Sequence, residues 1–181
     1  MKRAYPRVWL FTDERQCEKL WTALARLPRG AGVVFRHYGV AGRRAFGARV
    51  RAVARRRGLA FLVAGTARQA RSMRADGQHR PRWAPGGCAR GGRARGLFTA
   101  TAHGVAELRA AERAGAGLVF LSPVFATTSH PGMRPLGRVR LGLLARHARG
   151  PVAALGAVDA TRYRSLRTLG VSAWGGIDAH G

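Results

Sequence analysis

An α/β fold, a compact (β/α)8 TIM barrel, is predicted by the way short apolar runs alternate with helical patterns along the chain. About eight such runs can be counted, and alternation on this scale indicates a parallel sheet, either closed or open and doubly wound. The count favours the closed form. A second observation is the stretch Gly115–Gly137, in which the apolar run Leu118–Leu121 leads into a loop rich in hydroxyl groups, Gly and Pro. Barrels of this class build their sites in such loops.

The first half of the chain carries four expected strands, at Val8–Thr12, Gly32–Arg36, Leu59–Ala64 and Ala75–His79. Asp13 is a suitable cap for the first helix, whose apolar face would hold Cys17, Leu20, Leu24 and Leu27. The second helix is expected at Arg43–Arg57, ending at Gly58, with inward side chains Phe46, Val50 and Val53. The third helix is expected at Thr66–Arg74.

The second half begins with Arg80–Gly96, an irregular stretch rich in Pro, Gly and Arg. The strands expected after it are Leu97–Thr101, Leu118–Leu121, Val152–Leu155 and Ala173–Ile177. The helices are expected at Gly104–Ala114, with Val105 and Leu108 inward, near Arg138–Arg149, and from Asp159 to Leu169 before Gly170. Because the sequence stops soon after the last strand, we expect a truncated last helix.

Length and composition indicate one globular domain, residues 1–181, with 46% hydrophobic residues. No apolar run reaches the roughly 18–20 residues of a membrane span. The N-terminus lacks the features of a secretory signal. The two cysteines, Cys17 and Cys88, lack metal-type spacing and suggest free thiols. These observations predict a cytoplasmic protein that does not enter a membrane.

The charge is strongly positive, with 33 Lys and Arg against 8 Asp and Glu and a net charge of +25. Such a field attracts nucleic acid and anionic lipid without sequence preference. The arginines are nevertheless scattered over expected helix surfaces, with few aromatic residues between them. We therefore favour a compositional bias and expect nucleic acid to bind only non-specifically.

Polar and Gly-rich positions at the expected strand ends are candidates for a site. His103 is placed for acid/base chemistry, although a structural cap would explain it equally well. Arg36 is a candidate anion ligand. Glycines near the last two strands suit a phosphate, although close packing also uses glycine. His79 and His130 are expected to be structural or solvated, and with so few acidic residues we expect no metal site.

Several of these segments, taken together, resemble the thiamine phosphate synthase/TenI-like superfamily. SPVFATTSHPG at Ser122 is similar to the family's GPVF-T-T-K loop, and ADGQH at Ala75 to its ADGVH. TAH at Thr101 is similar to the family's S-x-H, and AALGAV at Ala153 to its AIGGI. The order and spacing agree from Val8 to the GGIDA segment at the end of the chain.

The resemblance implies a compact barrel and a set of ligands. The family's synthase couples an aminopyrimidine methyl diphosphate to a thiazole phosphate and releases diphosphate with Mg²⁺. The implied diphosphate or pyrimidine ligand is Arg36, and the implied ligands in the loop are Thr127 and His130, which stands in place of the family's lysine. Gly156 and Ala157 would donate backbone N–H groups to the thiazole phosphate, and Gly175 and Gly176 would complete the phosphate cup.

The chain departs from the family pattern at the positions that hold the metal. The family's Asn-Asp-Arg is Ala64-Gly65-Thr66 here, and its later Asp aligns near Ala84. The Gln and Lys that flank the family's arginine are Val34 and Tyr38. Both carboxylates expected to bind Mg²⁺ are therefore missing, and losing that metal would remove several kcal/mol of transition-state stabilisation.

The related thiazole tautomerase needs no metal and transfers a proton with the histidine of its S-x-H segment, which His103 matches. Three functions follow: a thiamine-pathway protein that binds a thiazole phosphate and resembles the synthase, a metal-independent tautomerase, and a non-catalytic anion- or RNA-binding barrel. The expected partners are a phosphorylated thiazole and, for coupling, the aminopyrimidine diphosphate. The sequence leaves open whether the protein forms a homo-oligomer and whether it is a member of the family that has lost its activity.

Overall fold

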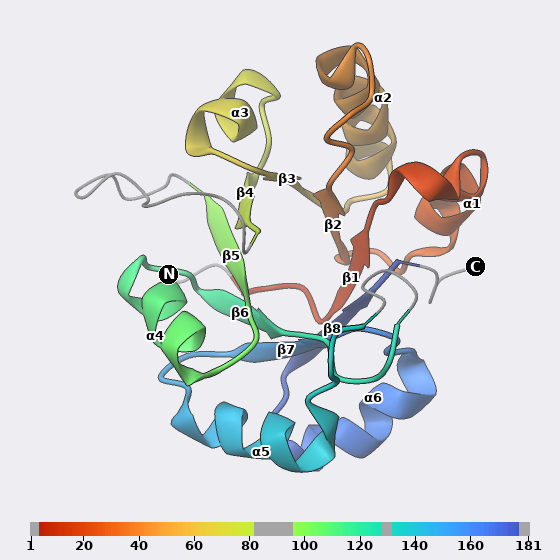
Figure 1. Ribbon diagram of the computed structural model, residues 1–181. Coiled ribbons are helices and arrows are strands. Elements are labelled where there is room, and N and C mark those ends of the chain that lie inside the picture. Colours follow the sequence, from red (N-terminus) through yellow and green to blue (C-terminus); the bar gives the residue numbers. More distant parts are fainter. Residues whose placement is uncertain (1–3, 82–95, 128–131, 178–181) are drawn as a thin grey trace.

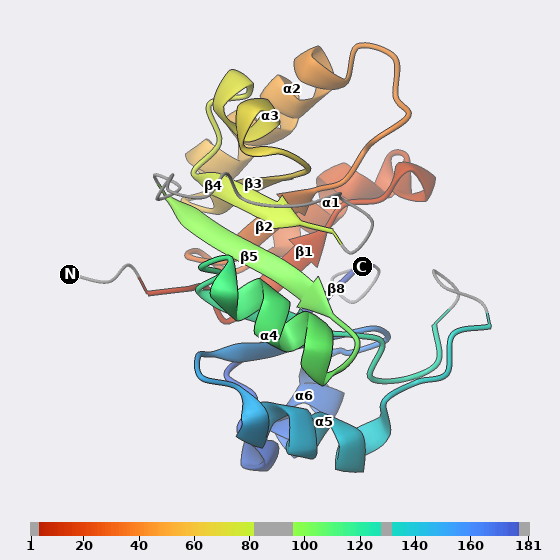
Figure 2. The same cartoon turned by 60° about the vertical axis from the view of Figure 1, so that its left-hand side comes forward.

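The strands form a closed, parallel, eight-stranded barrel in sequence order, and β8 pairs with β1 to close it. The computed structural model describes residues 4–81, 96–127 and 132–177, and its barrel is seen in two views in Figures 1 and 2. The strands are β1 Val8–Phe11, β2 Gly32–Phe35, β3 Ala60–Ala64, β4 Gly77–Arg80, β5 Leu97–Ala102, β6 Leu118–Leu121, β7 Val152–Leu155 and β8 Ala173–Gly176. The predicted strands differ from these by at most two residues at either end, which confirms the barrel.

Helices surround the strands in two groups, with α1–α3 on one side of the barrel and α4–α6 on the other (Figures 1 and 2). The first group is α1 Lys19–Arg26, α2 Arg43–Arg56 and α3 Ala67–Ser72, with the 3-10 turn η1 Glu14–Gln16 before it. The second group is α4 Val105–Arg113, α5 Gly137–His147 and α6 Ala160–Leu166, with the 3-10 turn η2 Arg167–Leu169 after it. None of the helices in the described ranges is long and apolar enough to cross a membrane.

Alternate strand residues separate the barrel interior from the layer under the helices. Trp9 and Phe11 of β1 point into the interior, while Leu10 between them packs outward against α1. The interior is filled by aromatic edge contacts, with the Phe120 ring centroid 5.7 Å from that of Trp9 and 4.8 Å from that of Phe11. A filled interior leaves room for a ligand only at the ends of the strands.

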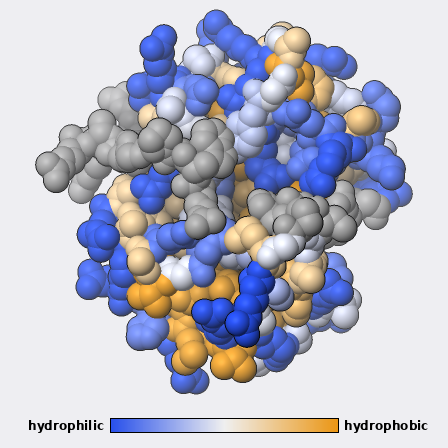
Figure 3. Space-filling model, in the orientation of Figure 1, coloured by the Kyte–Doolittle hydropathy of each residue, from blue (hydrophilic) through white to orange (hydrophobic). Residues whose placement is uncertain are grey.

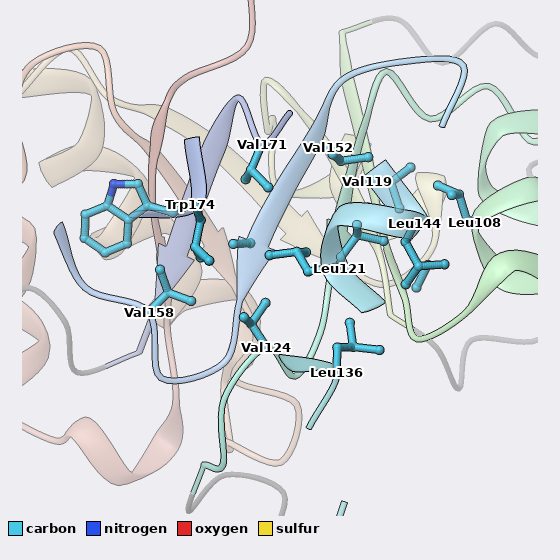
Figure 4. Close-up of a cluster of buried hydrophobic side chains, with 14 of the residues drawn as sticks. Leu108, Val119, Leu121, Val124, Leu136, Leu144, Val152, Val158, Val171 and Trp174 are labelled. Carbon is cyan, nitrogen blue, oxygen red and sulfur yellow. The ribbon is translucent and has the colours of Figure 1, made fainter. Parts of the chain in front are cut away.

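The outward strand faces are buried by the two helix groups. Under α4–α6, a continuous apolar cluster joins β6, β7 and β8 to the helices. Figure 4 shows Leu121 of β6, Val152 of β7 and Val171 just before β8 in the same cluster as Leu144 of α5. A matching cluster under α1–α3 includes Leu20, Leu24, Val50, Phe61 and Met73. Because the strands are covered on both faces, most of their sequences are nearly continuous apolar runs. The exception is β4, which carries Gln78, His79 and Arg80.

The start of the first helix differs from the prediction. Asp13 does cap a helical turn, but that turn is the short η1, where Asp13 and Gln16 form a capping box. Cys17 then ends this turn with a positive φ of 43°. Its side chain is exposed, so it does not belong to the apolar face of the first helix. The helix itself begins only at Lys19.

A smaller correction concerns α4. Leu108 is buried as predicted, but Val105 is 46% exposed. Val105 is the first residue of the helix, and at this end the chain is only beginning to pack against the barrel. Most of the irregular Arg80–Gly96 stretch and the expected truncated helix after β8 lie outside the described residues.

Candidate functional site

A cavity of about 750 Å³ lies where the carboxyl ends of the strands meet. The loops after β1, β2, β4, β5 and β6 all contribute to it, as barrels of this type allow. Its described lining residues are Phe11, Asp13, Glu14, Arg15, Arg36, Tyr38, His79, Pro81, Thr101, His103, Ser122, Met133 and Leu155. The cavity thus brings together Arg36 and His103, two residues that the sequence analysis selected from separate strands.

Arg36 follows β2 and is held at the cavity wall by the loop after β1. Its Nη2 donates to Asp13 Oδ2 at 2.8 Å, and its Nε donates to the carbonyl oxygen of Thr12 at 3.1 Å. Among the described residues, Nη1 has no hydrogen-bond partner. A guanidinium fixed through two of its nitrogens retains N–H groups for an anion in the cavity.

Asp13 is committed to cations on two sides. Arg15 donates to it through Nε at 2.6 Å, in addition to the contact with Arg36. The hydrogen bond from the Arg15 side chain is the largest cause that lowers the pKa of Asp13. The neighbouring Glu14 accepts a hydrogen bond from the backbone N–H of Gly39 at 2.8 Å. Both carboxylates on this side of the cavity therefore already accept hydrogen bonds from groups of the protein itself.

His103 follows β5, and its ring is held by Glu107 of α4. The distance from His103 Nδ1 to Glu107 Oε2 is 2.8 Å, and the same oxygen accepts the backbone N–H of His103 at 2.8 Å. No described residue hydrogen-bonds the other ring nitrogen, Nε2. The imidazole thus lines the cavity with one nitrogen engaged by the protein.

His79, in β4, lies deeper in the site and is fully held by hydroxyl groups. Its Nδ1 is 2.8 Å from Thr99 Oγ1, and its Nε2 is 3.1 Å from Thr101 Oγ1. Burial is the main cause that lowers the pKa of His79 to about 3. This histidine is structural, as the sequence analysis expected, and it is neutral although it borders the cavity.

The predicted phosphate residues lie beside the cavity rather than in its described lining. Gly156 and Ala157 follow β7 with φ values of 100° and 49°, in the left-handed region. Neither of their backbone N–H groups donates to any described residue. Arg162 of α6 donates through Nη1 to the carbonyl oxygen of Ala157 at 2.5 Å and lies over the ring of Phe125. Two backbone N–H groups without a described acceptor and the guanidinium of Arg162 therefore lie together at this loop.

The remaining predicted residues are placed as follows. Gly175 and Gly176 are buried in β8, and a Cβ at Gly175 would come within 2.9 Å of the Phe11 ring, so close packing accounts for this glycine. Thr127 is half-buried in the loop after β6. His130 lies outside the described residues.

Sequence reasoning missed Glu107, Asp13 and Arg162. Glu107 could have been found, because residues four apart on a helix face each other and His103 stands just before α4. No local pattern links Asp13 to Arg36, since closure of the barrel alone brings them together. In the described parts of the chain, no group of three or more His, Cys, Asp and Glu residues could hold a metal ion.

Comparisons with known proteins identify the family and the fold. The family model described as thiamine monophosphate synthase matches residues 8–179. A protein of Aquifex aeolicus that carries the provisional name thiamine-phosphate synthase 2 is 38% identical over 58 residues, which cover 32% of this chain and only 31% of that protein.

Two solved structures superpose over nearly the whole chain. Thiamine phosphate pyrophosphorylase from Pyrococcus furiosus has a TM-score of 0.78 at 21% identity, covering 96% of this chain and 86% of that one. The pyrophosphorylase from Bacteroides thetaiotaomicron has a TM-score of 0.62 at 15% identity, covering 96% and 83%. At these identities the likeness establishes the shared barrel fold.

Proposed function

The chain belongs to the thiamine monophosphate synthase family, and on this premise we propose that it binds a thiazole phosphate at the carboxyl ends of its strands. The reaction that the geometry supports best is metal-independent tautomerisation of that thiazole, with His103 as the acid/base. One observation carries the proposal: the cavity holds an anion ligand, Arg36, and an imidazole, His103, in one space. Tautomerisation needs only these two functions.

The donor set favours this reaction over coupling. Mg²⁺ requires oxygen ligands in near-octahedral geometry, usually including carboxylates. The positions where the family's synthase carries Asn-Asp-Arg are Ala64, Gly65 and Thr66, and Thr66 is used as the cap of α3. Asp13 and Glu14 are engaged by arginine and by a backbone N–H. The side chains that the structure describes therefore do not fit Mg²⁺, and the proposed reaction does not use the metal. Ala84, near which the family's later Asp aligns, lies outside the described residues.

Different parts of the site would bind the phosphate and act on the thiazole ring. The N–H groups of Gly156 and Ala157, with Arg162 beside them, are proposed to hold the phosphate. Backbone donors and guanidinium groups are both strong phosphate ligands. Arg36 is proposed to contact the ligand from the wall formed by the loops after β1 and β2. The thiazole would then lie across the cavity with a carbon facing His103, which moves a proton between two ring positions.

The decisive experiment replaces His103 and follows isomerisation of a thiazole phosphate by NMR. His103→Gln keeps a polar side chain but cannot exchange protons, so the isomerisation rate should fall by about 10²- to 10⁴-fold, the usual worth of a positioned acid/base. Phosphate-ligand affinity should stay within about twofold of wild type, because the anion ligands lie elsewhere. The exposed His147, changed to Gln, is the matched control. A wild-type isomerisation rate in His103→Gln would refute the proposed role.

A second assay separates tautomerisation from coupling. The two substrates of the synthase are incubated with the protein, once with Mg²⁺ and once with EDTA, and thiamine phosphate is measured. We expect no metal-dependent product. Robust turnover that EDTA abolishes would contradict the argument from the missing carboxylates and would add the aminopyrimidine diphosphate to the substrates.

Membership of a biosynthetic family also supports a single cytoplasmic domain that spans residues 1–181. We propose this arrangement together with the function. Gel filtration and cell fractionation would test it, and the former would also report whether the protein is a homo-oligomer.

A further inference from the structure

Glu107 links the start of α4 to His103, which precedes the helix. It is the third residue of the helix, and the cap position before the helix is Gly104, which has no side chain to accept a hydrogen bond. Glu107 Oε2 instead accepts from two donors of one residue, the backbone N–H and the ring Nδ1 of His103. One carboxylate oxygen therefore fixes both the backbone and the ring of the histidine.

We propose that Glu107 is the positioning residue that sets the tautomer of His103, an inference that rests on the proposed function. An ionised carboxylate only accepts hydrogen bonds. The Nδ1 atom that faces it must therefore carry a proton, which leaves Nε2 of the neutral ring with its lone pair. Because Nε2 has no partner among the described residues, this lone pair is the one available to a substrate. His103 is thus prepared as a base before the substrate arrives.

The proton balance of the reaction closes within this pair and the substrate. Nε2 takes a proton from one ring carbon, so a C–H bond breaks and an N–H bond forms. The imidazolium that results is stabilised by the carboxylate of Glu107, as in other carboxylate–histidine pairs. Nε2 then returns the proton to the second carbon, and the neutral ring is restored. No oxidant, reductant or further reactant is needed.

A competing role for Glu107 is to cap α4 and no more. A cap satisfies the backbone N–H of His103 and stabilises the start of the helix, but it leaves the ring tautomer undetermined. Glu107→Gln separates the two roles, since the amide oxygen can still accept the backbone N–H while the negative charge is lost. Glu112→Gln is the matched control: it removes the same charge from the same helix, where Glu112 binds Arg109 and the backbone of Arg149.

The test combines ring ¹⁵N NMR with kinetics on the intact chain of residues 1–181. In wild type, the resonances that disappear in His103→Gln should report protonation at Nδ1 and a free Nε2. In Glu107→Gln the amide oxygen can still accept from Nδ1, so the tautomer should persist, but the imidazolium loses its counter-charge, and kcat should fall by about 10²-fold or more while KM stays nearly constant. Glu112→Gln should change neither reading.

The outcomes distinguish this inference from the proposed function. Wild-type protein with the proton on Nε2 would overturn the role of Glu107 whether or not the protein isomerises a thiazole. A wild-type kcat in Glu107→Gln would reduce Glu107 to a helix cap. If instead His103→Gln retains full activity while the wild-type ring is protonated at Nδ1, the tautomer assignment stands and the proposed acid/base role of His103 fails. The wild-type spectrum is assigned with His103→Gln alone, so a poorly folded Glu107→Gln protein does not prevent the test.

Discussion

A buried neutral histidine beneath the cavity makes the stability of this protein depend on pH. His79 is only 2% exposed, and both ring nitrogens contact threonine hydroxyls. Hydroxyl groups can donate or accept, so they satisfy a neutral ring without favouring a charged one. Burial lowers its pKa from 6.5 to about 3, and the nearby charges of Arg36 and Arg80 act in the same direction.

The sign of the resulting pH dependence follows from the two pKa values. Between pH 6.5 and about 3 the unfolded chain binds a proton at His79, whereas the folded chain does not. The free energy of unfolding should therefore fall as the pH falls through this window, by up to about 1.4 kcal/mol per pH unit from His79 alone. Urea denaturation at pH 7, 6, 5 and 4.5 measures this slope.

Variants assign that slope to the buried residue. His79→Gln can still hydrogen-bond the two threonines but does not titrate, so its stability should depend less on pH than that of wild type. His147→Gln, on the exposed surface of α5, should keep the wild-type slope. Equal slopes in wild type and His79→Gln would show that His79 is not the origin.

At the scale of single elements, the start of α3 depends on one side chain. Thr66 Oγ1 accepts the backbone N–H of Gln69 at 3.2 Å, and Gln69 Oε1 accepts the backbone N–H of Thr66 at 2.8 Å. Thr66→Ala should lower the free energy of unfolding by about 1 kcal/mol. This loss corresponds to roughly 2–4 °C in Tm for a chain of this size.

Thr66→Ser, which keeps the hydroxyl group, is the control and should remain within a few tenths of a kcal/mol of wild type. Scanning calorimetry provides the comparison. If the alanine variant melts with the serine variant, the cap contributes nothing and the helix is held by packing alone.

Most strands were predictable from the sequence because they are short apolar runs buried on both faces, and β6 and β7 match their predicted bounds. The beginning of α1 was not. The turn at Glu14–Gln16 is held in part by Gln16, whose Nε2 donates to the carbonyl oxygen of Ile177 at 2.6 Å. A contact across 161 residues leaves no local pattern, so the capping signal at Asp13 was assigned to the wrong helix.

The candidate site was likewise predictable only in part. Arg36 and His103 could be selected from the sequence, since each directly follows a strand. The ion pair between Asp13 and Arg36 exists only because β1 and β2 are neighbours in the barrel. The prediction of Gly156 and Ala157 came from the family resemblance and still needs a ligand-bound measurement. Sequence therefore located the edge of the site better than its internal contacts.

For the molecule as a whole, the positive charge is unevenly distributed. Residues 19–75 contain 14 Lys and Arg and no Asp or Glu. They form α1–α3, and the corresponding upper part of the surface in Figure 3 is largely hydrophilic. Among the described residues, the large apolar side chains that are exposed are Tyr38, Val105, Val139 and Leu143, so α2 and α3 present none. This face suits phosphate groups better than the apolar interior of a lipid layer.

We therefore expect sequence-independent binding of nucleic acid, centred on α2 and strongly dependent on salt. Each phosphate contact adds about 0.7–0.9 to the slope of log K against log salt, so a 20-nucleotide RNA that binds at 50 mM salt should be mostly released at 200 mM. Replacing the exposed residues Arg44, Arg55 and Arg56 with Gln should reduce the slope by about 2–3. The same three charges removed from the opposite side, at Arg140, Arg146 and Arg167, should reduce it less. Equal effects of the two triple variants would mean that net charge, rather than this face, attracts the RNA. Affinity that persists at 200 mM salt and depends on sequence would instead indicate a dedicated RNA site, which the compositional interpretation of the arginines does not allow.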